Sequence, residues 1–326
     1  MNRSWTLIAL AAGALSAVAF MGVIRPSLVS IIMFYLAPAP LFMAGLAFGA
    51  VAAALGAAAG AAAIAVMLNV KAAGFYLLTS GLSPVVLTWL ALTSRPAAGG
   101  AEGEAADEQG REWYPEGRLL LWAAVMAGAL MSLTALMLGP SLAEFQGVLR
   151  DMAGQMLKSS GLPRGMTPDQ VKRLTDFVTA STPLAATALW EIITLANMAL
   201  AAWLLKRFGY PTRPWAPFWR LAFHPRAMIA LAVASFAAFL PGMFGLIGEI
   251  FATGLMTAFA ILGLAVVHAL TLGNPYQPVI LGLVYAGLLL LNWLLALPLI
   301  ILALADLSFG LRARLLAGRG GPPATT

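Results

Sequence analysis

The sequence predicts an all-α, polytopic membrane protein with eight or nine transmembrane helices in one bundle. Hydrophobic residues make up 61% of its 326 residues and charged residues make up 10%, whereas a soluble domain carries about 25% charged residues. Apolar runs of about 20 residues, the length with which a helix crosses a bilayer core, recur along the chain. The runs are continuously apolar rather than alternating, which excludes a membrane β-barrel, and open strands cannot cross lipid with unpaired backbone groups.

Composition also limits the partners. The chain contains no cysteine, so disulfides and thiolate metal sites are impossible. Its net charge of +6 is explained by basic residues at helix ends that face an anionic membrane surface. No concentrated basic face with a docking fold is evident, and we expect no nucleic acid and no cofactor. The expected partners are the lipid bilayer, a small-molecule ligand and other membrane subunits.

The apolar segments follow one another closely. The first resembles a signal peptide, because Arg3 precedes an apolar run and 17–19 is a small-x-small sequence; we expect a retained helix. Pro38 and Pro40 each lack a backbone donor and should break the second span. The third is nearly all Ala and Gly, which allows another helix to approach closely. The expected spans are 5–24, 28–46, 49–69, 72–93, 118–138, 181–206, 226–243, 247–271 and 277–305.

Three other segments fall outside these spans, although the whole chain, 1–326, is expected to form a single transmembrane domain. Residues 94–118 are rich in Gly, Ala and acids and predict a flexible loop. In 140–180, apolar residues at helical spacing predict an amphipathic helix on the outer membrane surface. A second helix starts there, with Thr167 as its N-cap, and runs toward the sixth span. Residues 312–326 are expected to be a disordered tail.

The distribution of basic residues predicts the orientation. A short loop after the sixth span contains five basic residues and no acid, so we place it in the cytoplasm of a bacterium, with the protein in the inner membrane. Six spans precede that loop, so the N-terminus is cytoplasmic as well. Three further spans would place the tail outside, yet its arginines favour the cytoplasm. One of the last three segments therefore does not cross, or the tail tolerates the outside. The basic residues are Lys206, Arg207, Arg213, Arg220 and Arg226 in the loop and Arg312, Arg314 and Arg319 in the tail.

The last third of the chain carries a resemblance. The sequence "FATGLMTAFAILGLAVVHAL", with Gly263-Leu264-Ala265 before His268, and "LLALPLIILALADLSFGLRAR", with Asp306, Phe309 and Arg312, are similar to a family of bacterial membrane proteins called domain of unknown function 2232. The segments "FWRLAFHPRAMIALAV" and "APAPLFMAGLAFG" extend the similarity. That family resembles, distantly, the substrate-binding S-components of energy-coupling-factor vitamin transporters, which implies transport. The acidic loop 94–118 and the lack of basic residues after Pro40 depart from the pattern.

Glu191 is the strongest functional candidate, because ionisable residues inside spans are costly and usually have a role. It lies near the middle of "ATALWEIITLANMALAAWLL". We expect a neutral, interior-facing acid that donates a hydrogen bond to Asn292 or to water, since no Lys or Arg lies in the middle of a span. A purely structural hydrogen bond is the alternative. Asn197, six residues later on a different face, is expected to join helices.

Other polar residues lie nearer the ends of the spans. One interpretation of Glu249, Arg25 and Lys71 is that they line an outward-facing polar pocket. We favour the alternative that they are ordinary interfacial charges. His268 is expected to be a packing residue, because only His224, in a loop, could join it as a metal ligand. Asp306 and Arg312 are six residues apart, too far for an ion pair on one helix face.

The sequence lacks a P-loop, a zinc-binding HExxH and a Gly-x-Ser-x-Gly elbow, and we do not expect an enzyme. Two classes of function remain: a small-solute transporter or transporter substrate-binding subunit, and a structural or assembly protein without a ligand. The observation that would distinguish the two classes is whether Glu191, Asn292 and the Pro38–Pro40 break meet at one cavity.

Overall fold

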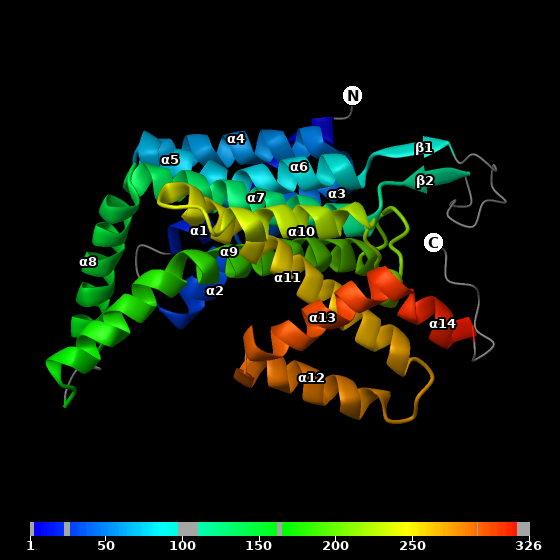
Figure 1. Ribbon diagram of the computed structural model, residues 1–326. Helices are drawn as coiled ribbons and strands as arrows, with labels where there is room; N and C mark the ends of the chain where they lie inside the picture. The colour runs from blue at the N-terminus through cyan, green and yellow to red at the C-terminus, as the bar shows by residue number, and fades with distance from the viewer. Residues whose placement is uncertain (1–2, 23–26, 97–109, 162–164, 292, 318–326) are drawn as a thin grey trace. The chain divides into compact units, whose positions relative to one another are not determined.

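A computed structural model of the chain describes residues 3–22, 27–96, 110–161, 165–291 and 293–317 (Figure 1). These residues are helical apart from turns, extended connections and one antiparallel pair of short strands. Contacts divide the chain into two compact units, each described by itself. Unit 1 comprises residues 1–123 and 192–216, and unit 2 comprises residues 124–191 and 217–326.

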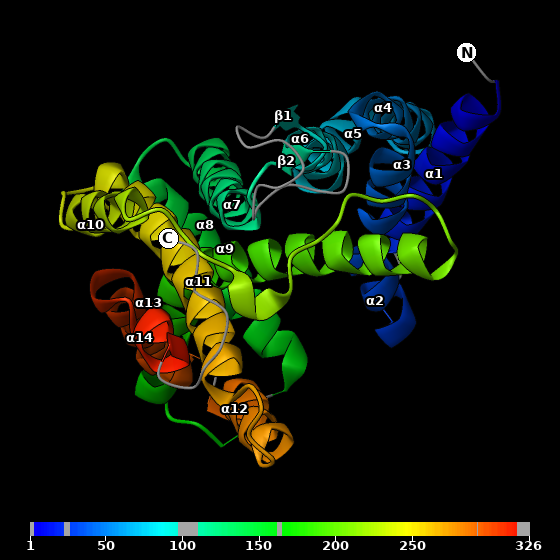
Figure 2. The same ribbon diagram turned by 90° about the vertical axis from the view of Figure 1, so that its right-hand side faces the viewer.

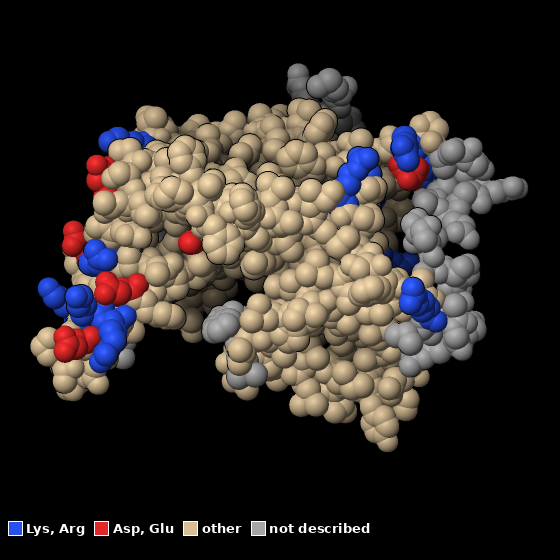
Figure 3. Space-filling model, viewed as in Figure 1, with Lys and Arg blue, Asp and Glu red and all other residues tan. Residues whose placement is uncertain are grey.

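The helices confirm a multi-pass membrane protein. Within the described ranges, seven helical stretches are long and apolar enough to cross a membrane. Most of the surface seen in Figure 3 belongs to residues other than Lys, Arg, Asp and Glu, as expected for a protein in contact with lipid. The stretches are Ser4–Met21, Leu28–Phe48, Ala50–Met67, Val70–Ala91, Glu116–Leu138, Pro168–Arg207 and Met243–Thr271.

Unit 1 is built around a close approach of two helices. A Cβ atom on Gly13 would lie 2.1 Å from the carbonyl oxygen of Gly56, so only glycine fits at this crossing. The Ala- and Gly-rich third span therefore packs closely, as its composition predicts. Gly49 instead lies in open space at φ 97°, between two helices. The first helices of the unit are α1 (Arg3–Met21), α2 (Leu28–Leu36), α3 (Ala39–Phe48) and α4 (Ala50–Met67).

The fourth span of unit 1 contains a π-helical turn. α5 (Val70–Tyr76) passes through the π turn Leu77–Gly81 into α6 (Leu82–Ala91). After α6, β1 (Ser94–Pro96) pairs antiparallel with β2 (Arg111–Trp113). The ends of the expected flexible loop 94–118 are thus paired strands, and α7 starts inside it. Residues 97–109 of that loop lie outside the described residues.

Two long helices contribute to both units. α7 (Glu116–Leu138) starts in unit 1 and ends in unit 2, whereas α9 (Pro168–Arg207) starts in unit 2 and ends in unit 1. α9 continues without interruption from the second helix of 140–180 into the sixth span, with Pro183 inside it. Its 40 residues measure about 60 Å at 1.5 Å per residue. That is about twice the hydrocarbon thickness, so part of α9 lies outside it.

In unit 2, α8 (Leu142–Ser160) is the amphipathic helix that the sequence predicts. It buries Phe145, Leu149, Ala153 and Leu157, one residue per turn, and the first two join Ala135, Leu246 and Ile250 in a core. Charged side chains lie over α8 and the start of α9 in Figure 3. Its position on a membrane surface stays a prediction.

The rest of unit 2 is organised around α11 (Met243–Thr271), which packs against α10 (Arg226–Ala237) and α13 (Trp293–Phe309) (Figure 2). α10 is shorter than the expected span 226–243, because residues 238–242 form a turn. A short 3-10 turn, η4 (Phe218–Arg220), precedes α10.

The last predicted span, 277–305, is wrong as a single helix. The structure has two helices there, α12 (Gln277–Leu291) and α13, of 15 and 17 residues, which turn back on each other (Figures 1 and 2). The expected disordered tail also differs, because α14 (Leu311–Ala317) is helical, and residues 318–326 lie outside the described residues. The single-domain organisation stays a prediction.

Candidate functional site

α9 carries a row of buried polar side chains along the part expected to lie in the membrane. Thr187 and Glu191 are 0% exposed, and Thr194 is 1% exposed. The Thr187 hydroxyl donates to the carbonyl of Pro183, 2.7 Å away, one turn earlier in the helix. Neither carboxyl oxygen of Glu191 has a hydrogen-bond partner among the described residues. Glu191 is therefore a fully buried acid whose polar atoms are unpaired, which is rare because burial of an unpaired polar group is costly.

Asn197 is the polar link that the sequence predicts. It is 3% exposed, and its Nδ2 donates to the carbonyls of Tyr35 and Ile193, each at 2.8 Å. The Tyr35 bond joins α9 to α2, 162 residues away in sequence. Asn197 belongs to unit 1 and Glu191 to unit 2.

The proline break between α2 and α3 is buried inside unit 1. α2 ends at Leu36 and α3 starts at Ala39, which is 8% exposed. Two backbone carbonyls at the Pro38–Pro40 break have protein donors. Ser16 Oγ donates to the carbonyl of Ala37 at 2.6 Å, in addition to the Asn197 bond to Tyr35. Because those side chains satisfy two of the freed carbonyls, this part of the break is held by the protein itself.

A second buried hydroxyl reinforces this arrangement. Tyr76, 0% exposed, donates from its hydroxyl to Ser16 Oγ at 2.8 Å. The chain of bonds thus runs from α5 through α1 to the break. The Ser16 hydroxyl both accepts and donates a hydrogen bond. A hydroxyl in such a chain is polarised by its neighbours, and this polarisation strengthens the hydrogen bonds on both sides.

The polar pocket of Glu249, Arg25 and Lys71 stays a prediction. Glu249 and Lys71 are both exposed, and they belong to different units. Arg25 and Asn292 lie outside the described residues, so the pairing of Asn292 with Glu191 stays a prediction. Glu249 and Lys71 have the exposure of ordinary interfacial charges.

His268 packs against aromatic rings. Its ring lies 5.1 Å from that of Phe218 and 5.9 Å from that of Tyr285, both edge-on, and Nδ1 contacts the carbonyl of Leu264 at 2.9 Å. His224 accepts a bond from the backbone of Arg226 instead. No group of three His, Asp or Glu residues able to hold a metal occurs within the described part of the chain.

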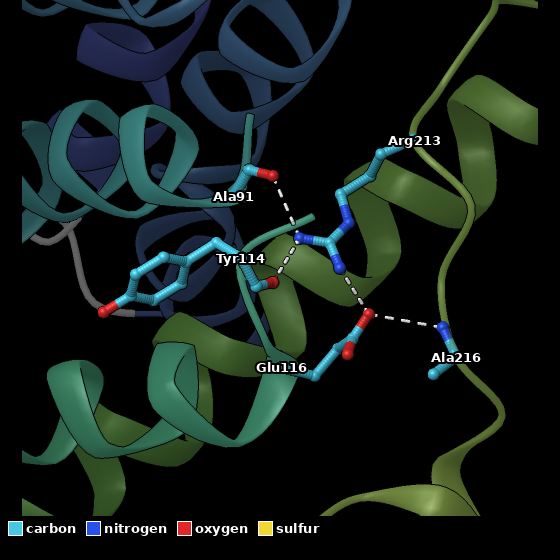
Figure 4. A network of polar contacts seen from close by, with 5 residues as sticks. All are labelled: Ala91, Tyr114, Glu116, Arg213 and Ala216. Atoms are coloured by element: carbon cyan, nitrogen blue, oxygen red, sulfur yellow. Dashed lines mark hydrogen bonds and ion pairs between the residues drawn. The ribbon is translucent and has the colours of Figure 1, made fainter. Parts of the chain in front are cut away.

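The sequence did not reveal the role of Arg213, which lies in the basic loop after α9 and is only 5% exposed (Figure 4). Nη1 donates to the carbonyls of Ala91 and Tyr114, at 2.9 and 2.8 Å. Nη2 pairs with Glu116 Oε1 at 2.5 Å, and the backbone N–H of Ala216 donates to the same oxygen at 3.3 Å. The guanidinium therefore joins the end of α6, the residue after β2, the first residue of α7 and the loop, all in unit 1.

The surroundings of Arg213 are consistent with a structural cation. Its guanidinium carbon lies 4.5 Å from the ring centre of Trp215 and 5.8 Å from that of Trp113, within the range of cation–π attraction. Burial lowers the pKa of Arg213, while the charge and hydrogen bond of Glu116 act in the opposite direction. The paired carboxylate offsets part of the cost of burying the cation.

Arg312 makes a similar set of contacts in unit 2, and here the spacing argument was wrong. Nε and Nη2 bind Asp306 Oδ2 at 2.8 and 2.7 Å, and the Arg312 backbone N–H donates to Oδ1. Nη1 donates to the carbonyls of Trp219 and Leu221, at 3.0 and 2.8 Å. The pair forms six residues apart because Gly310, at φ 62°, ends the helix and lets the chain fold back.

Comparison of the chain with models of known families, with curated proteins and with solved structures finds no match. The similarity to domain of unknown function 2232 and to S-components therefore stays a proposal.

Proposed function

We propose that the protein is a small-solute transporter, or the substrate-binding subunit of one, in the bacterial inner membrane, with Glu191 as its proton- or ligand-binding group. One observation carries this proposal: Glu191 is fully buried and neither of its carboxyl oxygens has a partner among the described residues. The resemblance to S-components agrees with this class of function.

The cost of the side chain is the physical reason. Insertion scales assign about 2.5 to 3.5 kcal/mol to an acid at the centre of a membrane helix. A hydrocarbon residue of similar size would avoid that cost, so a role for the carboxyl group must offset it. A neutral acid that exchanges a proton, or that binds a polar group of a solute, is such a role.

A reconstituted membrane can test whether Glu191 exchanges protons. A rapid pH jump on a solid-supported membrane that carries the protein should produce a charge displacement, because the site takes up or releases a proton. Glu191→Gln keeps the size of the side chain but cannot titrate, so we expect the signal to disappear. Glu249→Gln, at an exposed position, is the matched control and should retain it. A signal that is equal in wild type and Glu191→Gln would contradict the proposal.

A structural or assembly role is the second candidate, and one observation favours it. The carbonyls of Tyr35 and Ala37 at the proline break bind Asn197 and Ser16 rather than being left for a ligand. In a protein that binds no solute, such internal hydrogen bonds would serve only to hold the helices together. Under this alternative Glu191→Gln and Glu191→Leu would leave every pH-dependent signal unchanged.

We also propose that the end of unit 1 with the basic loop faces the cytoplasm. The support is that Trp89 and Trp203, both about 60% exposed, lie near the ends of α6 and α9, where Arg213 fastens the loop. Exposed tryptophans and basic residues together are typical of a cytoplasmic membrane interface. The N-terminus is placed on the same side, and eight spans cross the membrane if α10 is counted with the seven long stretches.

A further inference from the structure

Both open ends of the α12–α13 hairpin are attached to the same short segment of unit 2. At the start of α12, Gln277 donates to the carbonyl of His268, 3.5 Å away, and the His268 ring packs on Phe218. After the end of α13, Arg312 donates to the carbonyls of Trp219 and Leu221. One open end of the hairpin therefore contacts residues 219–221 directly, and the other reaches Phe218 through His268 of α11. This segment lies four residues before α10.

The hairpin is too short to reach the turn between α10 and α11. α13 crosses α11 where a Cβ atom on Gly263 would lie 2.0 Å from the carbonyl oxygen of Leu299. From Leu299 to Trp293, the first residue of α13, is six residues, or about 9 Å. From Gly263 to Met243, the first residue of α11, is twenty residues, or about 30 Å. Even if α13 ran parallel to α11, the tip would stop about 21 Å short of Met243.

The two ends of the hairpin differ in chemistry. The open end contains polar groups that are bonded within the unit, above all the Asp306–Arg312 pair. Near the tip, Leu289, Leu290 and Leu294 are 84%, 80% and 54% exposed. Large apolar side chains with that exposure, two at the end of α12 and one at the start of α13, are unfavourable in water but suit lipid acyl chains.

We propose that α12 and α13 form a re-entrant hairpin, in which Leu289, Leu290 and Leu294 contact acyl chains inside the bilayer and whose two open ends lie on the membrane face of residues 218–221. Length alone does not distinguish α12 and α13, with 15 and 17 residues, from α10, which has 12 and is counted as a crossing. The proposal rests instead on the distance of about 21 Å by which the tip falls short of Met243. Re-entrant backbone is tolerated where protein covers part of it, and here α11 packs along α13.

A re-entrant hairpin places the C-terminal arginines on the same side of the membrane as the basic loop, which three crossings would not. Only α10 and α11 cross between the basic loop and the hairpin, so the chain returns to the face of the basic loop. The hairpin then adds no crossing, and Arg312 and Arg314 lie on the same side as Arg220 and Arg226. Both basic segments therefore lie on one face, as the positive-inside rule requires. The inference depends on the geometry of unit 2 and does not depend on a transport function.

Cysteine accessibility can test the proposal directly, because the chain has no cysteine of its own. Four single-cysteine variants are treated with a membrane-impermeant maleimide in right-side-out and in inside-out vesicles. They are Asn274→Cys before α12, Leu290→Cys at the tip, Arg314→Cys after α13 and Phe239→Cys in the α10–α11 turn. We expect Asn274→Cys and Arg314→Cys to react in one vesicle orientation, Phe239→Cys in the other, and Leu290→Cys in neither.

A second measurement locates the tip. Leu290→Cys is labelled in detergent with an environment-sensitive fluorophore and reconstituted into vesicles whose lipids carry a nitroxide in the headgroup or in the middle of the acyl chain. We expect the mid-chain nitroxide to quench the fluorophore more strongly than the headgroup nitroxide does. Reaction of Leu290→Cys from the side of Phe239 would mean that the hairpin crosses, and opposite sides for Asn274 and Arg314 would mean a single span. Protection of Leu290 without quenching by lipid would mean that protein covers the tip. Each of these three results would overturn the proposal.

Discussion

Arg213 and Glu191 are both buried ionisable side chains, but their surroundings are opposite. Arg213, at a helix end in unit 1, meets two carbonyl oxygens and a carboxylate, and two tryptophan rings lie beside it. Glu191, inside α9 in unit 2, has no partner for either oxygen among the described residues. Arg312 repeats the arrangement of Arg213 with a different carboxylate and different carbonyls.

The two arginines are held by protein partners, whereas Glu191 is the side chain that we propose for function. A buried charge whose hydrogen-bonding positions are largely filled by protein is difficult to remove, because its partners would remain buried and unpaired. A buried acid without partners makes no such contribution, so its removal should affect stability little.

Replacement of Arg213 should have the largest effect on stability. Arg213→Met retains the apolar stem but leaves the Glu116 carboxylate and the carbonyls of Ala91 and Tyr114 without their donor. We expect the free energy of unfolding in detergent to fall by about 3 to 5 kcal/mol, as for other broken buried pairs. Arg213→Lys should recover part of the loss, because an ammonium group cannot reach all three oxygens. Arg207→Met, at an exposed position, is the control, and an equal loss there would refute the assignment.

Arg312→Met should be the next most harmful change. The Arg312 side chain is 12% exposed, so water can reach part of the vacated site, and we expect a loss of about 2 to 3 kcal/mol. Thermal unfolding of the same detergent-purified protein measures it. Arg314→Met, two residues later and exposed, should be close to wild type. If both variants behave alike, the Asp306–Arg312 pair does not stabilise the end of α13.

Asn197→Leu tests the bond that joins α9 to the proline break. Leu has a similar volume but cannot donate to the carbonyl of Tyr35, so we expect a loss of about 1 kcal/mol. Ser16→Ala should cost a similar amount, since it removes the donor to Ala37 and the acceptor of the Tyr76 hydroxyl. Chemical unfolding of purified variants can resolve these differences. Wild-type stability of both variants would show that the break needs no side-chain donors.

The exposed pair Arg95–Glu112 should have the smallest effect. A hydrogen bond from Arg95 lowers the pKa of Glu112 in the folded state. Because the pKa of Glu112 is lower in the folded than in the unfolded protein, its ionised form stabilises the fold at neutral pH. This stabilisation is lost as the pH falls through the pKa of the folded state, which lies below the ordinary Glu value of about 4.3. The thermal midpoint of Glu112→Gln should therefore differ slightly from wild type at pH 7, and the difference should disappear near pH 3 or in high salt. A large difference that persists at low pH would contradict this.

Some of these features could be predicted from the sequence because they depend on local composition. Apolar runs predicted the seven long apolar stretches, the prolines predicted the break, and Glu191 stood out as an acid in an apolar helix. The small residues of the third span predicted the close approach at Gly56. In each case a few adjacent residues determine the outcome, whatever the rest of the chain does.

The features that were missed depend on distant or irregular parts of the chain. Arg213 and Glu116 are 97 residues apart, and the only local signal is an arginine between two prolines and before Trp215 in "PTRPWAP". Asp306 and Arg312 meet because Gly310 ends the helix, whereas helical spacing assumes that the helix continues. α12 ends at Leu291 and α13 starts at Trp293. The run around that point has no Pro or Gly and only Asn292 as a polar residue, so composition favoured one long helix.

An infrared difference spectrum between wild type and Glu191→Gln, both reconstituted in lipid at neutral pH, reports the protonation state of Glu191. The claim is that Glu191 is a neutral carboxylic acid, kept without a charged partner so that it can exchange a proton or bind a solute. The predicted result is that the substitution removes the carbonyl stretch of a protonated carboxyl group, while the unfolding temperature stays near that of wild type. Loss of the stretches of an ionised carboxylate instead would contradict the claim, because Glu191 would then be a charge with a cationic partner.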